Sequence, residues 1–286
     1  MANSLYLVIA VLAVGVVALV LGLRARVSVR DVEWLAGKQA VPAAEAEVYR
    51  RYLQRHRRHR IVGASIGAIL HVSIGLPYEQ RLVLIGAGDV GPLADLFFSV
   101  VTGAVIGALS AETYRLRQPR STVAAASLAP RAPVAPPGVV RAARILTCAV
   151  LLWTIGSFCV TGYPGGLHLA AFGTALAIVA EATRYAVTAR RRPVRSARAV
   201  EVDSRIRAFA GETVSWLQLT AATLVVAWLL APPQVPDESP WNVLLRVLSV
   251  GGLIVSVVLL LRAAPRQRQR PRRRQRAPLV APVGVS

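Results

Sequence analysis

Four ionisable side chains within apolar stretches are the residues of this sequence that could do chemistry inside a membrane. They are Asp95, Arg246, His71 and His168. A charge at the centre of a bilayer costs about 2.5 to 3.5 kcal/mol on insertion scales, so each such residue requires a reason. The four could form a polar relay for a small solute or an ion. The structural alternative is that Asp95 and Arg246 reach the outer surface and that His71 makes one interhelical hydrogen bond.

Arg246 shares one helical face with Ser249, Gly252 and Ser256, a pattern that predicts a side chain directed into the bundle. A buried arginine needs an acidic partner. Asp95 is the candidate, because it is expected at a similar depth in another helix.

Two further acids stand near the expected inner ends of helices, each three residues before an arginine. The pairs are Glu112 with Arg115 and Glu181 with Arg184. Residues three apart are neighbours on a helix surface, so we interpret both pairs as structural anchors at the membrane interface.

No sequence motif of an enzyme or a cofactor site occurs in the context that its chemistry requires. Residues 86–91 fit G-x-G-x-x-G, but Glu112 lies on the same apolar helix that follows and not at the end of a second strand, so we expect an external turn. Cys148 and Cys159 are about 16 Å apart on one expected helix, too far for a disulfide. We assign no catalytic residue, no metal ligand and no cofactor.

Long apolar segments alternate with basic segments and must position these residues. With 55% hydrophobic residues, the chain predicts an all-α integral membrane protein with about seven transmembrane helices, one N-terminal helix followed by three helical hairpins. The expected segments are an N-terminal transmembrane helix (1–23), a basic cytoplasmic segment (24–60), a first hairpin (61–115), a Pro/Ala-rich cytoplasmic linker (116–143), a second hairpin (144–187), a basic cytoplasmic loop (188–212), a third hairpin (213–262) and an Arg/Pro-rich disordered tail (263–286).

The distribution of positive charge predicts the orientation of these helices. Only Arg81 lies in an expected external loop and only Arg246 near the outer end of a span, so the N-terminus is expected outside and the C-terminus in the cytoplasm. The net charge of +20 comes almost wholly from arginine, and the Ala, Val and Arg bias favours a bacterial cytoplasmic membrane. Because the arginines lie between apolar segments, we do not expect nucleic-acid binding.

The basic segment from 24 to 60 contains a helical pattern with one apolar stripe, formed by Val48, Tyr49, Tyr52 and Leu53. One interpretation is an amphipathic helix that lies on anionic lipid headgroups. The other is a solvated charged face without a specific partner.

Small residues recur every fourth position on both helices of the first hairpin. They are Gly63, Gly67 and Gly75 on one helix, and Ser99, Gly103 and Gly107 on the other. This spacing favours close helix packing in a membrane. Counting from the inner ends predicts that Gly63 lies beside Ala111, Gly67 beside Gly107, His71 beside Gly103 and Gly75 beside Ser99.

The leading hypothesis for function is a non-enzymatic scaffold or accessory subunit that contacts lipid, and either a membrane-protein partner or further copies of itself. The first alternative is a small-solute or ion transporter that uses Asp95, Arg246 and His71. The second alternative is a membrane-embedded enzyme. The sequence shows no substrate or partner.

Overall fold

The computed structural model describes residues 15–16, 20, 27–75, 92–113, 135–162, 164–189, 197–231 and 239–264. These residues form seven α-helices and one short π-helical segment, with no strand among them. In chain order the elements are α2 (Val29–Ala36), α3 (Ala43–Leu70), η1 (His71–Gly75), α4 (Pro92–Thr113), α5 (Pro137–Thr161), α6 (Gly165–Ala189), α7 (Ala197–Leu229) and α8 (Pro240–Arg262). The predicted all-helical class is confirmed for this part of the chain.

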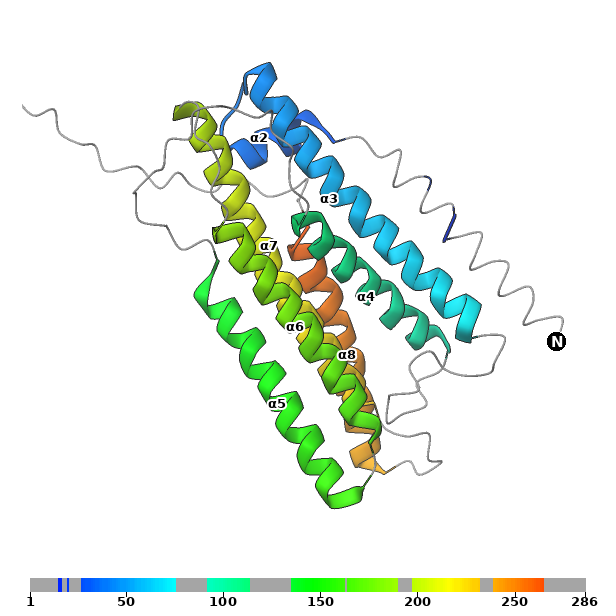
Figure 1. The fold of residues 1–286 in the computed structure, drawn as a ribbon. Coiled ribbons are helices and arrows are strands. Elements are labelled where there is room, and N and C mark those ends of the chain that lie inside the picture. Colours follow the sequence, from blue (N-terminus) through cyan, green and yellow to red (C-terminus); the bar gives the residue numbers. More distant parts are fainter. Residues whose placement is uncertain are drawn as a thin grey trace, which may run out of the picture.

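The long helices form one bundle in which consecutive helices run in opposite directions (Figure 1). α3 and α4 pack together on one side of the bundle, and α5 to α8 form the other side. α4 joins the two parts, because it also packs against α6 and α7. The short helix α2 contacts α3 and α7 at the end where both begin.

Four helices are long and apolar enough to cross a membrane: α4 from Asp95, α5, α6 from Gly166, and α8. This finding supports a membrane protein with a helix bundle. The predicted first span, residues 1–23, lies outside the described residues except at positions 15, 16 and 20. α3 and α7 hold two further predicted spans but are not among the four, so seven spans stay a prediction.

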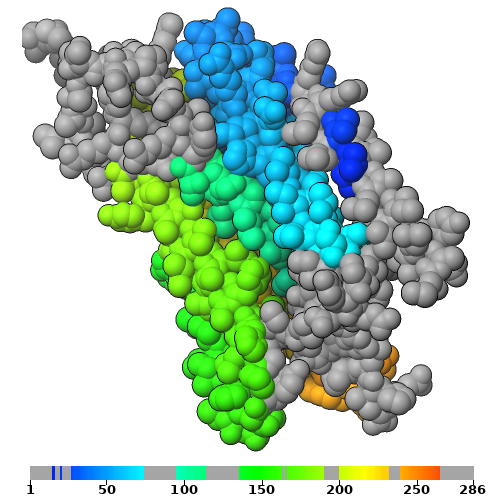
Figure 2. Space-filling view, turned by 45° about the vertical axis from the view of Figure 1, so that its right-hand side comes forward, coloured from blue at the N-terminus to red at the C-terminus, as the bar shows by residue number. Residues whose placement is uncertain are grey.

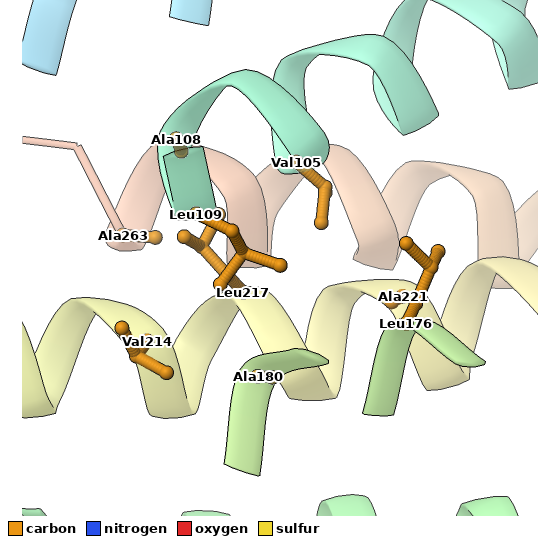
Figure 3. Close-up of a cluster of buried hydrophobic side chains, with 9 residues drawn as sticks. All are labelled: Val105, Ala108, Leu109, Leu176, Ala180, Val214, Leu217, Ala221 and Ala263. Atoms are coloured by element: carbon orange, nitrogen blue, oxygen red, sulfur yellow. The ribbon is translucent and has the colours of Figure 1, made fainter. Parts of the chain in front are cut away.

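α7 is the central helix of the bundle. Its side chains Val214, Leu217, Leu224 and Trp228 are at most 2% exposed. Figure 3 shows Leu217 enclosed by side chains of α4, α6 and the residue that follows α8. A helix surrounded by protein does not need a lipid-facing surface, which explains why α7 also carries buried polar side chains. These are Thr213, Ser215, Gln218 and Thr220.

α5 and α8 have the opposite character. Of the 18-residue apolar stretch that could cross a membrane, only 17% is buried within the protein in each of these two helices, against 56% in α4. Their exposed side chains include Leu152, Trp153, Ile254 and Leu261. Large apolar surfaces of this kind face lipid in a membrane protein or contact a partner.

The basic segment before residue 61 differs from the prediction. α3 is one continuous helix from Ala43 to Leu70, so no boundary separates the segment from the expected span. Tyr49, Tyr52 and Leu53 are at most 2% exposed and pack with residues of α2 and α7. These three residues of the stripe therefore contact protein and not lipid, whereas Val48 is exposed. The sequence did not reveal the partner surface because residues 188–212 read as a basic loop, whereas α7 already begins at Ala197.

α2 is held in place by local bonds at both of its ends. The Ser28 hydroxyl accepts a hydrogen bond from the Asp31 amide at 3.2 Å, and the Ser28 amide donates to the Asp31 carboxylate at 3.1 Å. This capping box binds two amides that the first helical turn would otherwise leave without partners. At the other end, Gly37 takes a left-handed conformation with φ +64°, which glycine adopts at little cost. The short helix thus presents Val32 and Leu35 to Tyr49 and Tyr52.

Candidate functional site

The α3–α4 contact is made by backbone and not by side chains at its centre. A Cβ atom on Gly63 would lie 2.1 Å from the Gly103 carbonyl oxygen, and one on Gly67 would lie 2.1 Å from the Ser99 carbonyl oxygen. Conversely, a Cβ atom on Gly107 would lie 2.1 Å from the His59 carbonyl oxygen. Only glycine permits this approach, which also favours Cα–H···O contacts between the helices. We call this contact the glycine seam.

The predicted faces of the two helices meet, but the predicted pairing is wrong. Gly63 lies against Gly103 and Gly107 and not beside Ala111, and Gly67 lies against Ser99 and not beside Gly107. The displacement is about one to two helical turns. The prediction failed because it took residue 61 as the inner end of a helix, whereas α3 begins at Ala43 and its depth is set by packing.

The four ionisable residues of the predicted relay divide into two groups. His71 and Asp95 are buried, at 6% and 4% exposure. The register that sets Gly63 against Gly103 and Gly67 against Ser99 continues, four residues further along each helix, to His71 and Asp95. η1, which begins at His71, packs against α4. The structure therefore brings these two residues to one level of the hairpin.

Arg246 and His168 lie elsewhere. The side chain of Arg246 is exposed on α8, although Ser249 and Ser256 of the expected shared face are buried. His168 is exposed near the start of α6. The structure thus corrects the prediction that Arg246 points into the bundle, because the buried face of α8 excludes its side chain.

Glu112, buried at the end of α4, binds Tyr52, which the sequence placed on an apolar stripe, and lies beside His56, for which the sequence predicted no role. Its Oε1 atom accepts a hydrogen bond from the Tyr52 hydroxyl at 2.6 Å and lies 3.4 Å from Nε2 of His56. Phe209 of α7 contacts the rings of both Tyr52 and His56 edge-on. Arg115, the expected partner of Glu112, lies outside the described residues. Glu112 therefore connects α4 to α3.

Tyr52 and His56 are four residues apart on one face of α3, together with Tyr49. This spacing was the only signal of the cluster in the sequence. It did not predict the cluster, because both interpretations of the segment, a helix on anionic lipid and a solvated charged face, treat it as separate from the span and from other helices.

Buried positive charge surrounds His56. Burial lowers the pKa of His56 well below its usual value, and the nearby Arg60 and Arg55 side chains act in the same direction. Burial also lowers the pKa of Arg60 to about 10. Its guanidinium donates a hydrogen bond of 2.6 Å to the Leu260 carbonyl, which connects α3 to α8. His56 is thus neutral at physiological pH in a site where a proton would be unfavourable.

Glu181 has the corresponding role on α6. Its carboxylate accepts two hydrogen bonds from Arg144 of α5, at 2.8 and 3.0 Å, and one from the Gln218 amide of α7 at 3.1 Å. It also forms an ion pair with Arg184, which in turn donates to the Gln218 side-chain oxygen at 3.3 Å. Glu181 therefore joins α5, α6 and α7. The sequence predicted only its contact with Arg184 within α6.

Within the described ranges, no three His, Cys, Asp or Glu side chains gather where they could hold a metal ion. Cys148 and Cys159 are both exposed thiols on α5.

Comparison with known proteins adds no relative. No family model matches the chain, and neither a curated protein nor a solved structure matches it.

Proposed function

We propose that the protein is a non-enzymatic scaffold or accessory subunit of the bacterial cytoplasmic membrane. The observation that carries the proposal is that two acidic side chains bind other helices of the bundle. Glu112 and Glu181 each accept hydrogen bonds from side chains of neighbouring helices. A transport path or an active site needs polar groups that reach a solute or substrate. These acids instead stabilise one arrangement of the helices, as a docking platform requires.

The proposal includes seven spans, with the N-terminus outside and the C-terminus in the cytoplasm. The concentration of arginines in the expected cytoplasmic segments supports this orientation. The opposite directions of consecutive helices support it as well, since they place the first halves of α3 and α7, which both carry arginines, on one side. The exposed arginines of that side would contact anionic lipid headgroups.

Extraction from native membranes in a mild detergent tests the scaffold proposal. The chain without its tag has a mass of 30.5 kDa, and we expect the tagged protein in a larger assembly with a reproducible co-purifying protein or with further copies of itself. Native mass spectrometry gives the mass and composition of that assembly. A uniform monomer without any companion would contradict the proposal.

A solute or ion transporter is a second candidate function, and the level shared by the buried His71 and Asp95 favours it. The candidate predicts that His71→Ala and Asp95→Asn fold normally and each abolish one transport or growth phenotype. His168→Ala serves as the matched control, because this histidine is exposed. Unchanged phenotypes of both variants would eliminate the candidate.

A further inference from the structure

A groove of about 890 Å³ runs beside the glycine seam. α3 and α4 form its floor and most of its walls, and Leu169 and Phe172 of α6 complete it. Figure 2 shows α3 lying along α4, with α6 on the other side of α4. The glycines of the seam, Gly63, Gly67, Gly103 and Gly107, line this groove, so its floor is formed where the two backbones touch.

The two ends of this groove differ in chemistry. Arginines and a histidine line the end near the first half of α3, whereas the remainder is lined by apolar side chains, the seam glycines and the uncharged residues Ser99, Thr102 and Ser110. The polar end contains Arg51, Arg55, Arg58 and His59, and the apolar part contains Val62, Ile66, Leu70, Phe98 and Ile106. No carboxylate is among the described residues that line the groove. The groove therefore has the charge pattern that complements an amphiphile with an anionic head.

One side chain at the polar end, that of Arg58, has donors available for such a head. Arg58 is exposed, and no ion pair joins it to an acid of the described ranges. Nδ1 of His59 lies 2.9 Å from the Ser110 hydroxyl oxygen, whose proton is donated to the Gly107 carbonyl at 2.7 Å. Nδ1 must therefore be the donor to Ser110. Burial lowers the pKa of His59, so its ring is neutral and its Nε2 atom is an acceptor that cannot donate to a phosphate.

The length of the groove matches one leaflet of a bilayer. The twelve residues from His59 to Leu70 rise by about 18 Å along α3, and half of the hydrocarbon core of a bilayer measures about 15 Å. We propose that the groove binds one anionic glycerophospholipid, with its phosphate beside Arg55 and Arg58 and its acyl chains along the glycine seam. This inference is independent of whether the protein is a scaffold.

Photo-crosslinking with a defined lipid tests this site. The full chain is reconstituted in phosphatidylcholine vesicles that contain a trace of phosphatidylglycerol with a photoactivatable acyl chain. We expect crosslinks to concentrate on residues 62–70 and 98–106. The same photoactivatable group on phosphatidylcholine should label these residues much less, because the two headgroups differ in net charge.

Variants separate a bound lipid from general charge attraction. Arg55→Gln and Arg58→Gln should each lower labelling about fivefold, whereas Arg141→Gln, an exposed arginine near the start of α5, should not. Ile66→Trp should block the groove, and Ile178→Trp on the exposed face of α6 should not. The comparison of the two lipids needs only the native chain and holds even if a variant misfolds.

Any one of the following results would overturn the proposal. The first is equal labelling of the groove by both lipids. The second is labelling spread evenly over the exposed faces of α5 and α8, as for lipids without a fixed site. The third is undiminished groove labelling in Ile66→Trp, or a groove that neither lipid labels because another segment or partner occupies it.

Discussion

Glu112 shows how a single buried acid can determine helix position. A carboxylate at this depth is costly unless its oxygens accept hydrogen bonds, and Tyr52 supplies one across the α3–α4 contact. The relative position of α3 and α4 is therefore set by close backbone packing at the glycine seam and also by the hydrogen bond between Tyr52 and Glu112.

Tyr52→Phe should lower the free energy of unfolding by about 1 to 3 kcal/mol, because a buried acceptor loses its donor while the ring packing is kept. Thermal unfolding in detergent, followed by circular dichroism, measures the change. Tyr185→Phe is the control, since this tyrosine is 74% exposed on α6. Equal midpoints for the two variants would show that the bond to Glu112 contributes nothing.

His56 predicts how stability depends on pH. Burial and the neighbouring arginines lower its pKa in the folded state, while the unfolded state keeps a value near 6.5. Glu112 opposes this shift across 3.4 Å, but burial and two cations outweigh it. Stability should therefore be unaffected by His56 above about pH 7.5, and should fall as pH drops below 6.5, by at most about 1.4 kcal/mol per pH unit.

Unfolding midpoints of the native chain and of His56→Gln between pH 5 and 8 test this prediction. The native chain should lose stability toward pH 5 more steeply than the variant, which cannot take up the proton. Parallel curves would show that His56 is not kept neutral by the fold.

The glycine seam is the decisive contact at the scale of elements. Gly63→Ala would place a methyl group 2.1 Å from a backbone oxygen, so α3 and α4 must separate. Overpacking of this kind costs about 1 to 3 kcal/mol. Gly156→Ala is the matched control, because nothing lies within 4 Å of its Cβ position, and the higher helix propensity of alanine should leave it equally or more stable.

The thermal unfolding midpoints of Gly63→Ala and Gly156→Ala test whether the α3–α4 contact stabilises the protein. A Gly63→Ala protein as stable as Gly156→Ala would mean that the two helices are not in backbone contact.

The sequence was sufficient for the small-residue faces of α3 and α4, since four-residue spacing is a property of each helix alone. It was insufficient for their pairing, because depth depends on where α3 begins, and Tyr49 and Tyr52 look the same whether they face lipid or protein. The contacts of Glu181 likewise include one that the sequence could predict and two that it could not. Its neighbour Arg184 is local in sequence, whereas Arg144 and Gln218 reach it only through the packing of α5 and α7.

At the scale of the whole molecule, the arginines predict the orientation of the chain. A reporter that is active only in the cytoplasm, fused after Ser286, should be active, and one fused before Met1 should be silent. A silent reporter at the C-terminus would refute the proposed orientation. The control is a reporter that is active only outside the cytoplasm, at the same two positions, which should give the reverse result.

The scaffold proposal requires that partners recognise a bundle held rigid by the glycine seam. The most direct test compares the proteins captured from native membranes by the native chain, by Gly103→Leu and by Gly156→Leu, each first shown to be helical after extraction. We predict that the native chain and Gly156→Leu retain the same companion and that Gly103→Leu, whose side chain must push α3 from α4, loses it. A native chain without a companion, or equal capture by all three proteins, would contradict the account.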